Sequence, residues 1–172
     1  MEIKIRFARK SDLKKYTDLL QWTYQEAYTN ESLGLTKELF SKEIFNTPDT
    51  QKYLLGNLEV TDKQKTWLAF LKFKLIGSVT LTHKNGECEI RGFYVKTRHQ
   101  GKGIGKKLWN LALKFSQGKD IVLDLYAHNT KTINMYKRWG FKIDKEKGEF
   151  YRHWPEWPEG IEAKCIYMRY KQ

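Results

Sequence analysis

The stretch Val95–Gly105, Val-Lys-Thr-Arg-His-Gln-Gly-Lys-Gly-Ile-Gly, constrains the fold of this chain more than any other. It follows an apolar segment and is basic, with three glycines in five residues. Apolar side chains at helical spacing come directly after it. They are Ile104, Leu108, Leu111, Ala112 and Phe115. Because glycine lets a backbone approach a ligand and the first N–H groups of a helix lack partners, a strand, a glycine-rich turn and a helix predict a phosphate site.

Spacing excludes two common phosphate-binding loops. A Walker A loop requires Gly-x-x-x-x-Gly-Lys-Ser/Thr, which does not occur here, and a dinucleotide fingerprint requires Gly-x-Gly-x-x-Gly. The run Gly101-x-Gly103-x-Gly105 has a different second spacing. A third pattern, Gln/Arg-x-x-Gly-x-Gly/Ala, fits Gln100-x-x-Gly103-x-Gly105. The alternative is a glycine-rich turn that binds nothing, and the remainder of the chain has to decide between the two.

Length and composition indicate one globular domain over residues 1–172, with 40% hydrophobic residues. The N-terminal residues alternate charged with apolar side chains, unlike a signal peptide, and no apolar run reaches the length of a membrane span. We therefore expect a soluble cytoplasmic protein with no membrane partner. Cys88 and Cys165 lie far apart and form no Cys-x-x-Cys pair, which favours reduced, buried thiols over a disulfide or a metal site.

The formal net charge of +12 is compatible with an anionic ligand, with nucleic acid or simply with solubility. The lysines are spread along the whole chain instead of forming one basic block. This distribution argues against a nucleic-acid partner.

Hydrophobic periodicity predicts a mixed α/β domain (an α+β mixed sheet) in the order β-α-α-β-β-β-α-β-α-β-β. Asn85-Gly86 predicts a hairpin, and the helix that follows the glycine-rich turn predicts one parallel βαβ step. Residues 51–60 are ambiguous, and Asn46–Asp49 is expected to end the second helix. The strands are predicted at 3–7, 66–71, 75–82, 87–95, 121–126 and 161–170, with strand material at 141–143 and 148–151, and the helices at 11–28, 36–45, 104–117 and 129–139.

The strand over residues 87–95 contains a break in its alternation. Ile90 and Phe93 are both apolar at an odd spacing, with Gly92 between them. This pattern predicts a β-bulge, which reverses the faces of the side chains that follow. The alternative is that Gly92 only relieves crowding.

A second motif runs from Asn129 through Tyr136 to Gly140-Phe141. Together with Gln100-x-x-Gly103-x-Gly105 and the element order, it resembles the GNAT superfamily of N-acetyltransferases over nearly the whole chain. The resemblance implies a GNAT-like acyl-CoA N-acyltransferase fold, acetyl-CoA as cosubstrate, no metal, and direct attack by an amine in a ternary complex. Thr97 and Gln100 stand where the family often has Pro and Arg, and Gln is within the allowed pattern.

The resemblance also implies which residues bind the cofactor. Backbone groups of the strand would contact the pantetheine arm, the turn would contact the pyrophosphate, and the second motif would contribute two side chains. These residues are Phe93, Tyr94, Val95, Gln100, Gly101, Lys102, Gly103, Ile104, Gly105, Asn129 and Tyr136. Two alternatives stay open, namely that Asn129 is a plain helix N-cap and that Tyr136 is a core aromatic residue.

In the family a tyrosine protonates the leaving thiolate, and Tyr136 is the candidate for this general acid. A base must also deprotonate the amine, and Glu89 is the first candidate. Its carboxylate could equally be solvated or paired across the hairpin, and in many family members a water chain replaces a single base. His128 and His153 have a suitable ordinary pKa, but nothing in their spacing distinguishes them.

In this family the acceptor pocket is built by the first two helices and the loop between the last strands. Aromatic side chains mixed with carboxylates in these segments suit a cationic amine. The candidates are Trp22, Glu26, Tyr28 and Trp154. The alternative is a Pro-rich loop that closes on its own side chains.

We therefore predict an acetyl-CoA-dependent N-acetyltransferase. Its acceptor would be a primary amine, such as a polyamine, another small amine, or a peptide or protein N-terminus, and a homodimer is compatible with the sequence. The competing prediction is a non-catalytic CoA-binding module or a basic nucleic-acid-associated module on the same fold.

Overall fold

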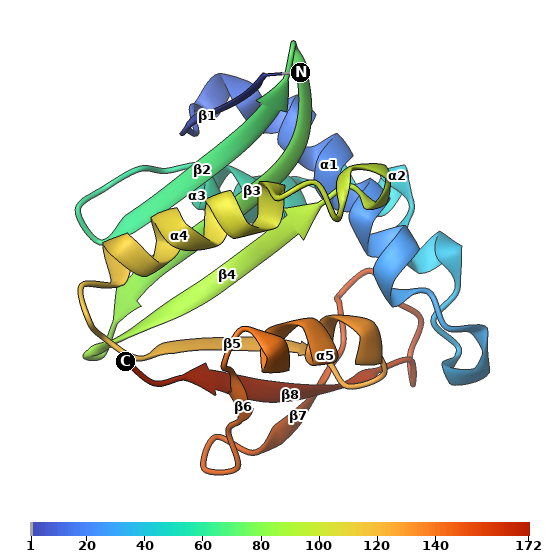
Figure 1. Ribbon diagram of the computed structural model, residues 1–172. Helices are drawn as coiled ribbons and strands as arrows, with labels where there is room; N and C mark the ends of the chain where they lie inside the picture. The colour runs from blue at the N-terminus through green and yellow to red at the C-terminus, as the bar shows by residue number, and fades with distance from the viewer. Residues whose placement is uncertain (1) are drawn as a thin grey trace.

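A computed structural model describes residues 2–172, in which eight strands form one mixed sheet (Figure 1). The strand order is β1-β2-β3-β4-β5-β8-β6, and β7 pairs with β8. Only the β4–β5 pairing is parallel among these strands, so the predicted mixed sheet with one parallel step is confirmed. The strands are β1 (Ile3–Phe7), β2 (Gln64–Leu71), β3 (Lys74–Lys84), β4 (Glu87–Val95), β5 (Ile121–Tyr126), β6 (Lys142–Ile143), β7 (Glu149–Arg152) and β8 (Ala163–Tyr170).

Three of the five α-helices follow the prediction closely, and the segment between α1 and β2 does not. The helices are α1 (Leu13–Tyr28), α2 (Lys42–Phe45), α3 (Pro48–Asn57), α4 (Ile104–Ser116) and α5 (Thr130–Arg138). The predicted second helix is wrong, because extended backbone at Ser41 divides it into a 3₁₀ turn, Lys37–Phe40, and the single turn α2. The predicted stop is present, since α2 ends at Phe45 with Asn46 as its C-cap. The same segment also starts α3, where Thr47 caps the Thr50 N–H and proline occupies the first turn.

The helices cover both faces of the sheet. In Figure 1, α4 and α5 lie in front of the sheet, and α1 and α3 lie behind it. Alternate side chains of β2 pack into the cores on the two faces of the sheet. Trp67 and Ala69 belong to the core under α4, and Leu68 and Phe70 belong to the core under α1. Both cysteines are free and buried, as expected. Within residues 2–172, no helix is both long enough and apolar enough to cross a membrane.

The predicted β-bulge lies in β4. Thr80 pairs with Gly92 and Leu81 with Ile90, so Arg91 is the extra residue. Ile90 before the bulge and Phe93 after it both belong to the core under α4, which is the predicted change of parity. Crowding contributes as well, because a Cβ at Gly92 would lie 2.6 Å from the ring of Tyr94.

Strands β4 and β5 are paired only at one end. Their parallel register comprises Cys88 with Ile121 and Glu89 with Val122. Beyond that point β4 pairs with β3 alone and β5 with β8 alone, so the two strands diverge. The edge of β4 after Glu89 therefore has backbone groups that no neighbouring strand engages.

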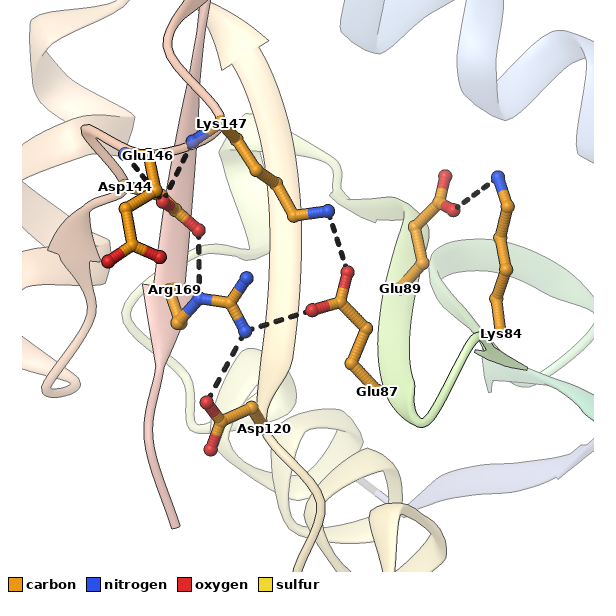
Figure 2. A network of polar contacts seen from close by, with 8 residues as sticks. All are labelled: Lys84, Glu87, Glu89, Asp120, Asp144, Glu146, Lys147 and Arg169. Carbon is orange, nitrogen blue, oxygen red and sulfur yellow. Dashed lines mark hydrogen bonds and ion pairs between the residues drawn. The ribbon is translucent and has the colours of Figure 1, made fainter.

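A network of ion pairs ties the elements together at the paired end (Figure 2). Arg169 of β8 contacts Glu87 at 2.9 Å, Asp120 at 3.3 Å and Asp144 at 2.8 Å, and Lys147 contacts Glu87 at 2.7 Å. Burial alone would raise the pKa values of Glu87 and Asp144, but their hydrogen bonds to Lys147 and Arg169 lower them overall. The network therefore links the start of β4 to β8 and to the segments before β5 and after β6.

Candidate functional site

The glycine-rich turn joins β4 to α4 by way of one 3₁₀ turn, Thr97–His99. Gly101 and Gly103 have φ values of +74° and +76°, a conformation in which a side chain is strained. Gln100 donates its backbone N–H to the Thr97 carbonyl and its side-chain N–H to the Val95 carbonyl, at 3.0 Å each. The side chain and amide of Gln100 thus shape the turn, and the free donors begin at Gly101.

The turn presents donors and positive charge together. Within residues 2–172, no acceptor engages the N–H groups of residues 101–106, the last three of which form the first turn of α4. Burial and the neighbouring Arg98 lower the pKa of Lys96, and the pKa of His99 is lowered by burial, Arg98 and Lys102. A site where cations disfavour one another attracts an anion.

A cavity of about 510 Å³ lies where β4 and β5 diverge. Residues 89–94 of β4 form one wall, and residues 123–126 of β5 form the facing wall. Tyr136 of α5 reaches it from one face of the sheet, and Tyr24 and Tyr28 of α1 reach it from the other. The cavity therefore connects the two faces of the sheet, which allows two different ligands to meet inside it.

Tyr136 is buried and lines this cavity. Its ring packs against Phe93, Trp139 and Phe141, with centroid distances of 6.5, 6.0 and 5.1 Å. Burial raises the pKa of its phenol, which therefore stays protonated at neutral pH and can donate. The core position and the position at the cavity are compatible, since the ring fills the core and the residue still borders the cavity.

Asn129 caps α5, where its side chain accepts from the Thr132 N–H at 3.3 Å. Asn129 is therefore a helix N-cap, which was one of the two roles considered for it from the sequence. The residue does not border the cavity, and its contact with a cofactor stays a prediction.

Glu89 borders the cavity at the point where β4 and β5 separate. Its carboxylate lies 3.3 Å from the ammonium group of Lys84 and is about one-third exposed (Figure 2). Glu89 therefore both forms an ion pair across the hairpin and borders the cavity. Neither of the two candidate histidines borders this cavity. His128 contacts the Tyr28 carbonyl, and His153 contacts the Ile161 carbonyl.

The four predicted acceptor residues divide into two pairs. Tyr28 and Trp154 line the cavity, and Trp22 and Glu26 do not. Trp22 is half exposed, and Glu26 accepts from the Thr97 hydroxyl at 2.6 Å. The physical reason is helix periodicity. Tyr24 and Tyr28 are one turn apart on the face of α1 that borders the cavity, whereas positions 22 and 26 lie on a different face.

Several cavity residues were missed by the sequence analysis. They come from α3, β5, β7 and the bulge, and are Asp49, Thr50, Tyr53, Arg91, Asp124, Tyr126 and Arg152. Asp124 carried a signal, because it is the one charged residue in the apolar run Ile121–Tyr126. The others carried none, since sequence gives no sign of which residues α3 and β7 bring to β5.

The cavity is more acidic than the protein as a whole. Four carboxylates and two guanidinium groups border it in a chain of net charge +12. The groups are Asp49, Glu89, Asp124, Glu156, Arg91 and Arg152. Within residues 2–172, no group of three or more His, Cys, Asp or Glu side chains is arranged to hold a metal ion.

Comparisons with known sequences agree on one family. A sequence model of the acetyltransferase (GNAT) family matches residues 15–141. The chain is similar to a spermine/spermidine N(1)-acetyltransferase of Bacillus subtilis, with 29% identity over 83 residues, or 46% of this chain and 55% of the relative. It is also similar to a spermidine N(1)-acetyltransferase of Vibrio cholerae, with 26% identity over 76% of this chain and 69% of that protein. The chain thus spans little more than half the length of the Bacillus relative.

Solved structures share the fold. The PaiA N-acetyltransferase of Thermoplasma acidophilum in complex with coenzyme A has a TM-score of 0.76 at 21% identity, with full coverage of both chains. NAA60 of Arabidopsis thaliana in complex with a bisubstrate analogue has a TM-score of 0.68 at 18% identity, covering 98% of each chain. The predicted fold is thereby confirmed.

Proposed function

Because this chain belongs to the acetyltransferase (GNAT) family, we propose that it transfers an acetyl group from acetyl-CoA to a primary amine. The observation that carries the proposal is the cavity between β4 and β5, which is lined from both faces of the sheet and bordered by Tyr136 and Glu89. One ligand would enter from the α4 side and the other from the α1 side.

The acetyl thioester would be held by the wall that α4 and β4 form. The N–H groups of residues 101–106 supply donors for the pyrophosphate, with the exposed side chains of Lys102, Lys106 and Lys107 around them. The unpaired edge of β4 supplies backbone groups for the pantetheine arm and one N–H that would polarise the thioester carbonyl. Phe93, Tyr94 and Val95 form that edge.

Each chemical step has a candidate residue. Glu89 would take the proton of the acceptor ammonium, directly or through water, so that the neutral amine attacks the thioester carbon. The C–S bond then breaks, Tyr136 would give its proton to the departing thiolate, and the second proton that the attacking nitrogen loses would return to the phenolate. Burial raises the pKa of Tyr136, which keeps its phenol protonated and able to donate a hydrogen bond to the departing sulfur.

The acceptor class follows from the acidic, aromatic lining of the cavity. Tyr28 and Trp154 offer ring faces, and the carboxylates of Asp49 and Glu156 offer charge, which together suit a protonated amine before it reaches the base. The relatives that are polyamine N-acetyltransferases agree with an amine acceptor. Polyamines, other small amines and peptide N-termini are all in the proposed class.

Release of free thiol from acetyl-CoA, measured with a panel of polyamines, small amines and peptides, tests the proposal. We expect turnover with at least one amine and formation of the acetylated product by mass spectrometry. Tight binding of CoA with no turnover on any amine would contradict it and favour the non-catalytic module.

Glu89→Gln tests the proposed base with an isosteric side chain. We expect a lower kcat and a change in the shape of the pH–rate profile, because the variant cannot accept a proton. An unchanged profile would assign deprotonation to water alone.

A further inference from the structure

The most unusual charged group in the cavity is Arg152, at the end of β7. Its Nη2 contacts the Asp124 carboxylate at 2.6 Å, which is the hydrogen bond that the structure gives its guanidinium within residues 2–172. An arginine carries five N–H donors in a fixed plane. Arg152 therefore borders the cavity with donors to spare.

The guanidinium also packs against two aromatic rings. It lies 5.6 Å from the ring centroid of Tyr126 and 5.2 Å from that of Phe150. Its side chain is 29% exposed, and that of its partner Asp124 is 24% exposed. A cation that is held by one carboxylate and two rings and borders a cavity with further donors is prearranged to bind an oxyanion.

Charge is distributed unevenly around this cation. Glu156 accepts hydrogen bonds from Thr47 and Thr50, which places its carboxylate at the start of α3 together with Asp49. Arg152 instead lies at β7 beside β5, where it pairs with Asp124. The cavity thus offers carboxylates at the start of α3 and the spare N–H donors of the Arg152–Asp124 pair at β5 and β7, which suits a ligand that carries both an ammonium group and a carboxylate.

We propose that Arg152 determines acceptor specificity by binding a carboxylate of the acceptor, so that the favoured substrates are amines with an adjacent carboxylate, as in α-amino acids. This inference rests on the proposed acetyl transfer and narrows its acceptor class. The free donors of Arg152 would form charge-assisted hydrogen bonds with the carboxylate, while Asp124 keeps the guanidinium in its plane. A polyamine has no group for these donors and meets a cation there.

Matched acceptors test the inference in the wild-type protein. The sets are phenylalanine, phenylalanine amide and phenethylamine, and lysine, lysine amide and cadaverine, with spermidine added. We expect kcat/KM for the free acid to exceed that for the amide by about tenfold or more, the size expected for a lost charge-assisted pair. The amine of the amide is less basic than that of the free acid, so a larger fraction of it is unprotonated at neutral pH. Basicity alone would therefore make the amide the faster substrate.

Two variants connect the preference to Arg152. The double variant Asp124→Asn with Arg152→Gln removes both partners of the pair, so that no unpaired carboxylate is left to attract cations, and we expect the acid-to-amide ratio to fall to about one. Arg91→Gln is the matched control, because Arg91 borders the same cavity but lies over the Tyr53 ring and contacts Gln64. It should keep the preference for the acid.

The outcomes separate this inference from the proposed function. Faster acetylation of spermidine, the amides or the decarboxylated amines would overturn the role of Arg152 and leave acetyl transfer intact. An acid preference that survives the double variant would also overturn it. If no amine is acetylated, calorimetric titration of phenylalanine into the CoA-loaded protein still tests the carboxylate site. Binding that depends on Arg152 would support the site, and absence of binding would refute it. Circular dichroism establishes that the variants are folded, and the wild-type comparison needs no variant.

Discussion

The two walls of the cavity differ in how far apart their residues lie along the chain. The wall that we propose for the cofactor is β4, where residues 89–94 border the cavity, and it continues into the turn and the start of α4, so that the proposed cofactor site is consecutive over residues 89–106. The acceptor wall combines α1, α3, β5 and the segment after β7, and its hydrogen bond from Thr47 to Glu156 joins positions separated by 109 residues. A wall made of consecutive residues can be recognised from a sequence motif. A wall made of residues far apart in the chain forms only when whole elements pack together.

The same difference appears in what each wall presents. The cofactor wall offers backbone N–H groups, which any sequence that adopts the turn would offer. The acceptor wall offers side chains such as Tyr24, whose hydroxyl contacts the Tyr94 hydroxyl at 3.0 Å. Substitutions should therefore affect cofactor binding through backbone conformation and acceptor binding through side-chain identity.

The largest effect is expected at Tyr136, where the two walls meet. Tyr136→Phe keeps the ring that packs on Phe141 and removes the proton, so kcat should fall by about 10²-fold with little change in the Kd for CoA. Tyr170→Phe is the matched control, because Tyr170 packs on the same phenylalanine outside the cavity. Equal kcat values for the two variants would remove Tyr136 as the acid.

The next effect concerns the ion-pair network at the paired end of β4 and β5. Arg169→Gln leaves Glu87 and Asp144 without their guanidinium partner, and we expect the free energy of unfolding at pH 7 to fall by about 2 kcal/mol. Chemical denaturation measures this quantity. Lys84→Gln, which breaks a more exposed pair with Glu89, should cost less.

The pH dependence of stability gives a second readout of this network. The folded pKa values of Glu87 and Asp144 are lowered, so their contribution is complete above the ordinary values of 4.5 and 3.8 and is lost as pH falls through the lowered ones. The wild-type protein should therefore lose more stability on acidification than Arg169→Gln. Parallel curves for the two proteins would contradict the role assigned to Arg169.

A smaller effect distinguishes backbone conformation from ligand contact on the cofactor wall. Gly103→Ala and Gly118→Ala place a Cβ at φ values of +76° and +80° at the two ends of α4, with no atom within 4 Å of either. Both should lose about 1 kcal/mol of stability, and only Gly103→Ala should weaken CoA binding. Calorimetric titration with CoA makes the comparison, and equal affinities would argue against the turn as the pyrophosphate site.

The smallest effect is expected outside the acceptor wall. Trp22→Ala should leave the KM for the acceptor unchanged, because Trp22 is half exposed and does not border the cavity. Trp154→Ala should raise that KM, since Trp154 borders the cavity and contacts Tyr24 with a centroid distance of 5.5 Å. A reversed order would mean that the amine binds on the outer face of α1.

The sequence by itself determined the features that depend on neighbouring residues. Asn85-Gly86 forms the hairpin with both residues at positive φ, the odd spacing around Gly92 marks the bulge, and the glycine-rich turn leads into α4. Each depends on local backbone conformation, which residue type controls directly. The family resemblance rests on the glycine-rich turn, the motif from Asn129 to Phe141 and the element order that hydrophobic periodicity predicts.

Only the tertiary structure decided which side chains line the acceptor wall. The pairing of Arg152 with Asp124 and the position of Glu156 at the start of α3 depend on strand pairing and on loop closure over many residues. Periodicity finds the apolar face of α1, but it cannot say that Tyr28 borders a cavity while Glu26 contacts the turn at Thr97. Contacts between distant residues depend on the packing of whole elements, and a single sequence leaves that packing unspecified.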